Sequence, residues 1–128
     1  MPPCSPLSNA YGYPLLIKHL LTRSNIASAC QEIVSGTEMR LSYAELDQRV
    51  RQLANALKAS GIREGMRVGV MDWDTHRYLE CFFAIPMMGV TLFTINVRLS
   101  PAQVLYTINH GRPDLIIVHR DFIPLVED

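Results

Sequence analysis

The stretch Leu41-Ser42-Tyr43-Ala44-Glu45-Leu46 marks the start of the clearest helix in this chain. Ser42 and Glu45 stand three residues apart and form a capping-box pattern, in which each side chain bonds a backbone N–H at the helix start. Apolar residues then recur at helical spacing, at Leu46, Val50, Leu53, Ala54 and Leu57. Gly61 is a natural terminator, because glycine adopts the left-handed conformation easily. We therefore expect an amphipathic helix between Ser42 and Gly61 that covers a sheet.

Beyond this helix, apolar segments of strand length alternate with helical patterns. The strands are predicted at Arg67–Met71, Val90–Ile95 and Leu115–Val118. Each crossover contains a helix with a capping residue at its start, first Asp74 or Thr75 and then Ser100. Strands joined by helical crossovers are typical of a parallel sheet with helices on its faces. The predicted fold class is α/β, a three-layer parallel sheet flanked by helices.

The region before the helix that starts at Ser42 predicts a small N-terminal β-hairpin. Ala27–Val34 and Met39–Leu41 have the composition of short strands, and Ser35-Gly36-Thr37 between them suits a turn. Pro14 is a good first residue for a short helix ahead of this hairpin. Residues 1–13 are expected to be a flexible N-terminus, and residues 14–128 a single α/β subdomain.

Composition excludes several classes of protein. Hydrophobic residues make up 48% of the 128 residues and charged residues 19%, which suits a globular fold. The net charge of zero gives no electrostatic reason to expect nucleic acid as a partner. No apolar run approaches the ~20 residues of a membrane span, and the first residues lack the positive region of a secretory signal. Three widely spaced cysteines argue against a disulfide framework, so we expect a cytoplasmic protein.

Asp72 and Asp74 are the first candidate functional residues. They flank Trp73 just after a predicted strand, and ligands bind at the carboxyl ends of strands in open parallel sheets. Two carboxylates there suit a metal ion or a proton transfer. The same spacing, with Thr75 next to it, equally suits a loop and a helix cap, and this structural interpretation is favoured.

The other polar candidates are weaker. Arg98, close to Asn96, suits an anion, although such an arginine more often pairs with a carboxylate or a helix end. His76 is expected to face solvent, and Cys81 to be a small buried hydrophobic residue rather than a nucleophile. The remaining histidines lack metal-ligand spacing, so no zinc site is expected at His19, His110 or His119. The glycines at 61, 65 and 69 are spaced by four but do not follow a strand and open a helix, as a dinucleotide loop does.

Taken in order, several segments resemble the N-terminal part of the adenylate-forming acyl-CoA synthetases, the AMP-forming fatty-acid–CoA ligases. Leu41–Leu46 matches the first core motif of that family at every fixed position. Gly61–Met71 is similar to the family's turn and strand, with Met66 where an acidic residue is usual. Phe82–Asn96 is similar to the second core segment, with Met88 in place of the usual alanine.

One departure from the family pattern points to a branch. Thr94 stands where proline is usual, and Thr94–Gln103 is similar to the medium- and long-chain fatty-acid ligases. Tyr106–Val118 also fits that branch, and Tyr13–Leu21 adds a weaker match. The resemblance therefore covers nearly the whole chain from Tyr13, and it implies that the chain is part of the large N-terminal domain of a ligase.

The resemblance implies a two-step reaction for the parent enzyme. A carboxylate attacks ATP, assisted by Mg²⁺, to give an acyl-adenylate, and coenzyme A then displaces AMP. In relatives the phosphate loop, the nucleotide-binding segments, the ribose-binding aspartate and the catalytic lysine all come later. We therefore assign no catalytic, cofactor-binding or metal residue to these 128 positions, and we expect the fragment to be inactive alone.

Two other functions stay open from the sequence. The chain is alternatively a non-catalytic interaction module on the same scaffold, which self-associates as a homo-oligomer or pairs with a second chain. A truncated α/β layer exposes apolar surface and sheet edges that favour such association. A small nucleotide-binding domain is the weakest alternative, because no phosphate loop occurs. The expected partner under the leading hypothesis is the remainder of the ligase chain.

Overall fold

The computed structural model describes residues 12, 14–37 and 39–127 of the 128-residue chain. The described part has an N-terminal helix and hairpin followed by alternating strands and helices. The elements in chain order are α1 (Lys18–Ser28), β1 (Glu32–Ser35), β2 (Met39–Ser42), α2 (Tyr43–Ala59), β3 (Arg67–Met71), α3 (His76–Met87), β4 (Thr91–Thr94), α4 (Pro101–Gly111), β5 (Leu115–Val118), a 3-10 turn η1 (Arg120–Phe122) and α5 (Pro124–Glu127).

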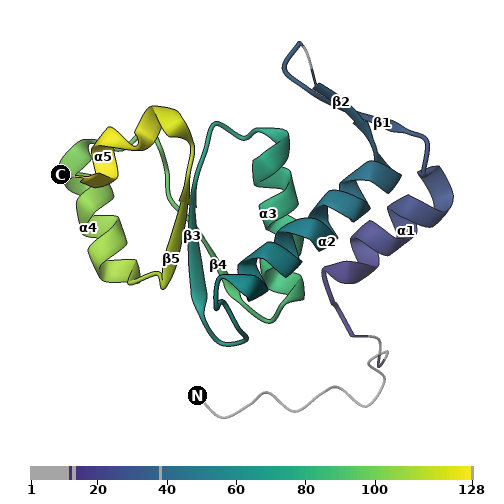
Figure 1. The fold of residues 1–128 in the computed structure, drawn as a ribbon, viewed down its shortest axis with the longest axis horizontal. Coiled ribbons are helices and arrows are strands. Elements are labelled where there is room, and N and C mark those ends of the chain that lie inside the picture. Colours follow the sequence, from purple (N-terminus) through teal and green to yellow (C-terminus); the bar gives the residue numbers. More distant parts are fainter. Residues whose placement is uncertain (1–11, 13, 38, 128) are drawn as a thin grey trace.

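Two separate sheets confirm the predicted fold class. β1 and β2 form an antiparallel hairpin, whereas β4, β3 and β5 form a parallel sheet with β3 at its centre. Figure 1 shows α2 and α3 on one side of the parallel sheet, α4 and α5 on the other, and α1 with the hairpin beyond α2. The parallel sheet is therefore the middle layer of three, as the alternation of strands and helices predicts.

The central strand is buried on both faces, which explains its continuous apolar sequence. Val68 and Val70 belong to a hydrophobic cluster with side chains of α2 and α3, including Leu57, Cys81 and Ile85. Met71 belongs to a second cluster with Val104 of α4 and Phe122 of η1. A third cluster joins α1, the hairpin and α2 around Leu21, Leu41, Leu46 and Val50. Among the described residues, these three hydrophobic clusters stabilise the packing between neighbouring layers.

The predicted starts of α2, α3 and α4 are confirmed at atomic level. Ser42 Oγ accepts a hydrogen bond from the backbone N–H of Glu45 at 3.2 Å, and Glu45 Oε2 accepts one from the backbone N–H of Ser42 at 2.7 Å. The hydrogen bonds that the Glu45 carboxylate accepts from the backbone N–H and the hydroxyl of Ser42 lower the pKa of this carboxyl. Thr75, rather than Asp74, caps α3. At α4, Pro101 is the first residue and Gln103 Oε1 accepts from the backbone N–H of Ser100 at 3.1 Å.

Two boundaries differ from the prediction. Helix α1 extends from Lys18 to Ser28, so the strand predicted to start at Ala27 begins only at Glu32, and Pro14 is not part of the helix. Packing of Leu21 into the cluster under α2 outweighs the strand-like composition of this segment. The prediction of a flexible region over residues 1–13 lies outside the described residues, except for the exposed Gly12.

The end of α4 has a left-handed residue next to a closely packed glycine. The residue that takes the left-handed conformation is Arg112, with φ 45°, and Gly111 is the last helical residue. Gly111 instead serves close packing, since a Cβ added there would lie 2.4 Å from the ring of Phe93. Within the described ranges, no helix is both long enough and apolar enough to span a bilayer.

Candidate functional site

The loop after the central strand contains Asp72 and Asp74 at the carboxyl edge of the sheet, as predicted. Asp72 Oδ1 accepts a hydrogen bond from the backbone N–H of Trp73 at 2.7 Å, and Asp72 Oδ2 accepts one from the Thr75 hydroxyl at 2.6 Å. Thr75 Oγ1 in turn accepts from the backbone N–H of Arg77 at 3.3 Å and so caps α3. Both oxygens of Asp72 are therefore used to fix the loop, which is the structural role that the sequence favoured.

Asp74 differs from Asp72 in its backbone and its exposure. Its φ of 59° places it in the left-handed region, which aspartate tolerates better than most residues. Its side chain is exposed, and it lines a cavity of about 250 Å³ together with Asp72, Asn96 and Arg98. The two carboxylates thus border one cavity, but only Asp74 is free of the loop bonds.

Trp73 links this loop to η1, the turn that follows the last strand. Its indole Nε1–H donates to Asp121 Oδ2 at 2.9 Å, and its ring lies 4.5 Å from the ring of Phe122, centre to centre. Trp73 is nevertheless 50% exposed. The sequence did not single out this contact, because Trp73 and Asp121 are 48 residues apart and share no motif.

A second, larger cavity also borders Asp72. It has a volume of about 510 Å³ and is lined by residues from the ends of β3 and β5 and from the start of α3. Asp72 and Tyr78 border both cavities. Tyr78 is only 8% exposed, and burial, followed by the nearby charge of Asp74, raises the pKa of its hydroxyl.

The structure agrees only in part with the expectations for Arg98, which were an anion site or a pairing with a carboxylate or a helix end. The backbone N–H of Arg98 donates to Asn96 Oδ1 at 2.9 Å, so Asn96 forms a local turn. The side chain of Arg98 is exposed at the rim of the smaller cavity, and within the described ranges it forms no ion pair. The pairing with a carboxylate that is common for such an arginine is therefore not seen within these ranges.

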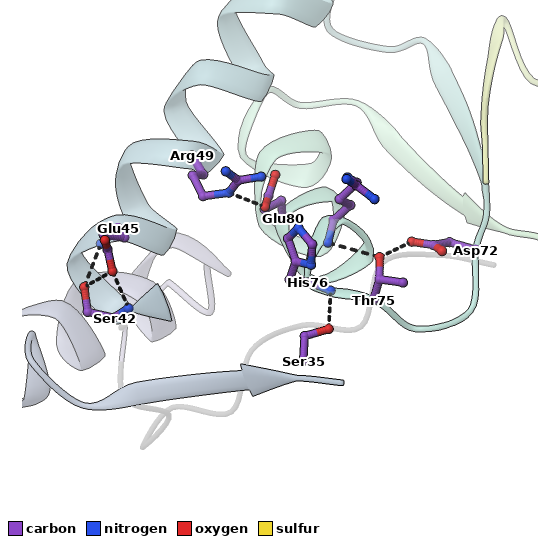
Figure 2. A network of polar contacts seen from close by, with 9 residues as sticks. Ser35, Ser42, Glu45, Arg49, Asp72, Thr75, His76 and Glu80 are labelled. Atoms are coloured by element: carbon purple, nitrogen blue, oxygen red, sulfur yellow. Dashed lines mark hydrogen bonds and ion pairs between the residues drawn. The ribbon is translucent and has the colours of Figure 1, made fainter. Parts of the chain in front are cut away.

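His76 was predicted to face solvent, and this prediction is wrong. Its Nε2 is buried and lacks a hydrogen-bond partner within the described part of the chain. Figure 2 shows the ring between the hairpin and the ion pair of Arg49 and Glu80, and the backbone N–H of His76 donates to Ser35 Oγ at 3.1 Å. Burial, assisted by the charges of Arg77 and Arg49, lowers the pKa of His76 against the opposing effect of Glu80 and Asp72.

The contacts and burial of His110, His119 and Cys81 indicate structural roles. His110 stacks on Tyr106 with ring centres 5.7 Å apart, and His119 Nδ1 accepts from the backbone N–H of Asp121 at 3.3 Å. In the described ranges, no three histidine, cysteine or acidic residues come together in a way that would hold a metal ion. Cys81 is 2% exposed, and burial raises the pKa of its thiol to about 12, so at neutral pH it is not a nucleophile.

Comparison with known proteins identifies the family. The family model described as AMP-binding enzyme matches residues 23–127. The chain belongs to this family. The resemblance of the sequence to the N-terminal part of the AMP-forming acyl-CoA synthetases is thus confirmed.

Two curated proteins similar to this chain are CoA ligases. The chain is 40% identical over 101 residues to a long-chain-fatty-acid–CoA ligase of Thermus thermophilus, covering 76% of this chain and 19% of that one. It is 34% identical over 117 residues to a 3-methylmercaptopropionyl-CoA ligase of Ruegeria lacuscaerulensis, covering 88% of this chain and 22% of that one. The chain therefore spans about a fifth of the length of these relatives.

Solved structures of the family share the fold of this member. The anthranilate CoA ligase AuaEII in complex with anthranoyl-AMP superposes with a TM-score of 0.82 at 28% identity, covering 90% of this chain and 23% of that chain. A benzoate CoA ligase from Burkholderia xenovorans superposes with a TM-score of 0.77 at 25% identity, covering 85% and 22%. The α/β fold of this chain is therefore shared with these ligases.

Proposed function

We propose that this chain forms the N-terminal layers of an AMP-forming ligase that joins a fatty acid to coenzyme A. The match of residues 23–127 to the family and the 40% identity to a long-chain-fatty-acid–CoA ligase support this function. ATP, Mg²⁺ and coenzyme A are then ligands of the parent enzyme, and the remainder of the ligase chain is the partner of these residues. A cytoplasmic location fits the reduced state expected of three widely spaced cysteines.

The proposed role of the 128 residues is support rather than reaction chemistry. Asp72 is bonded within its own loop, and Cys81 is buried with a strongly raised pKa, so neither is free for acid–base or nucleophilic work. The isolated chain should therefore show no ATP–pyrophosphate exchange with octanoate above the buffer blank. Clear exchange activity by the purified chain would overturn the proposal of inactivity.

A chimera tests the ligase assignment directly. In the Thermus thermophilus ligase, the segment aligned with residues 23–127 is replaced by the sequence of this chain. We expect the chimera to form acyl-CoA from a long-chain fatty acid, because the inserted layers carry the same core. Leu46→Asp in the same chimera is the control, since Leu46 is 1% exposed and a charge there disrupts the layer. A chimera that folds, as shown by its thermal melt, but forms no acyl-CoA contradicts the assignment.

A second candidate function is that of a non-catalytic interaction module, and one observation favours it. Three leucines at and before α1 are exposed, with 97% for Leu15, 48% for Leu16 and 64% for Leu20. They line a groove of about 450 Å³. Self-association through this surface predicts a dimer in sedimentation velocity that Leu16→Glu with Leu20→Glu converts to a monomer. A monomer at all concentrations for the unchanged chain contradicts this candidate.

A further inference from the structure

The order of the parallel strands creates a crevice between β3 and β5. From β3 the chain passes through α3 to β4 on one side, and then through α4 to β5 on the other side of β3. Figure 1 shows α3 and α4 on opposite faces of the sheet. The connections therefore change direction between β3 and β5. In open parallel sheets, ligands bind outside the carboxyl ends of the strands at such a point.

The cavity of about 510 Å³ lies at this crevice. Its walls contain Val70 and Asp72 from the end of β3 and Ile117 and Val118 from the end of β5. Cys81 from α3 adds a further apolar surface. The volume falls in the range that holds small organic ligands, and the apolar walls suit the body of such a ligand.

Two cationic side chains border the same cavity, one from the segment after β3 and one from the segment after β5. Arg77 comes from the first turn of α3, and Arg120 follows β5. Among the described residues the Arg77 side chain has no ion pair, and the pair of Arg120 Nε with Asp121 Oδ1 is long, at 3.7 Å, with the Arg120 side chain 88% exposed. Both guanidinium groups are therefore available, and guanidinium groups bind phosphate through paired hydrogen bonds.

The remaining polar groups on the lining agree with an anionic ligand. Asp72 is the acidic residue in the lining, and both its oxygens already accept hydrogen bonds from the loop. His119 Nδ1 lies 3.3 Å from the backbone N–H of Asp121 and 3.4 Å from Asp121 Oδ2, so this side of the ring faces Asp121. Two arginine side chains therefore face one carboxylate whose oxygens are already occupied, and this favours a dianion over a monoanion.

We infer that this crevice binds a phosphate monoester with a small apolar or aromatic body. The phosphate group lies between Arg77 and Arg120, and the body lies against Val70, Ile117 and Cys81. The lining residues named here belong to this chain. The inference is distinct from the ligase assignment, which the chimera tests without reference to these two arginines.

Calorimetric titration of the purified chain tests the site with three probes. Phenyl phosphate carries the phosphate and an aromatic body, AMP carries a nucleoside instead, and benzoate is a monoanion of similar size. We expect saturable binding of phenyl phosphate or AMP, with benzoate at least tenfold weaker because it carries one charge less. Binding of AMP without phenyl phosphate identifies a nucleotide as the source of the phosphate, and the reverse identifies another ester; either supports the site.

Matched variants locate the binding. Arg77→Gln and Arg120→Gln should each weaken binding about tenfold, as expected for the loss of one charge-assisted contact. Arg63→Gln makes the same charge change before the amino end of β3, on an exposed residue, and should leave affinity unchanged. No saturable binding of either phosphate probe by the folded chain overturns the inference. Equal losses in all three variants, or in none, overturn it as well.

Discussion

Arg49 Nε donates to Glu80 Oε1 at 2.6 Å and thereby joins α2 to α3 across the layer that covers the sheet. The two side chains differ in exposure, at 37% for Arg49 and 9% for Glu80. Glu80 is also the charged residue among the buried side chains of the described core. A buried carboxylate needs a partner charge, so this contact is a structural requirement of the layer.

Arg49→Met is expected to destabilise the fold. It leaves the carboxylate of Glu80 buried without its partner, and breaking a buried pair in this way costs about 3 kcal/mol, the lower end of the usual range because Arg49 is partly exposed. Urea unfolding followed by circular dichroism measures the loss. Arg40→Met is the matched control, because Arg40 pairs with Glu32 at the surface, with exposures of 63% and 58%, and such pairs contribute at most about 1 kcal/mol. Equal losses in the two variants would show that Glu80 is not dependent on Arg49.

His76 should make the stability depend on pH. In the unfolded chain the ring binds a proton near its ordinary pKa of 6.5, whereas burial lowers this pKa in the folded chain. The unfolded state therefore binds more protons just below pH 6.5, and the free energy of unfolding falls as the pH falls through this value.

The comparison of variants isolates this effect from other titrating groups. His76→Asn removes the ring, so the difference in unfolding free energy between it and the unchanged chain should vary between pH 7.5 and pH 5.5. His110→Asn, the same substitution at an exposed position on α4, is the control measured over the same interval. A constant difference for His76→Asn would mean that the ring is not excluded from water as the fold implies.

The cysteines should differ sharply in reactivity. Cys81 is buried with a thiol pKa of about 12, so at pH 8 roughly one molecule in ten thousand carries its thiolate, whereas Cys30 is exposed. Iodoacetamide at pH 8, followed by peptide mass spectrometry, should modify Cys30 within minutes and leave Cys81 intact. In 6 M guanidinium chloride both should react. Rapid modification of Cys81 in the native chain would indicate that α3 opens far more readily than its packing suggests.

Gly111→Ala should weaken the contact between α4 and β4. A Cβ at this position lies 2.4 Å from the Phe93 ring, so the ring must move, and overpacking of this kind costs about 1–3 kcal/mol. Phe93→Leu removes the far end of the ring and should make Gly111→Ala less damaging in a double-mutant cycle. Additive losses in the double variant would place the strain elsewhere.

Local signals in the sequence predicted most of the parallel layer. The capping box at Ser42, the cap at Thr75 and the apolar runs at Arg67–Met71 and Leu115–Val118 each depend on neighbours within a few residues. The structure has these elements at the predicted places. Patterns of this kind are visible in sequence because the same short-range contacts create them.

The features that sequence did not predict depend on distant partners. His76 is covered because Ser35, 41 residues earlier, places the hairpin against the start of α3. Trp73 meets Asp121 only after β3 and β5 have paired. The crevice itself is a product of strand order, and no residue pattern encodes the position of β5 beside β3. The sequence correctly favoured a structural role for Asp72 but gave no sign of the arginines near it.

Because β3 pairs with both β4 and β5, it should be the last element of the sheet to unfold. Its amides bond to β4 on one side and β5 on the other, and its side chains reach into hydrophobic clusters on both faces. If α2 and α3 on one face, or α4 on the other, moved away from the sheet, this strand would be exposed to water. Amide protons of Val68, Val70 and Met71 should accordingly be the last to exchange with deuterium, at a rate set by opening of the entire parallel sheet.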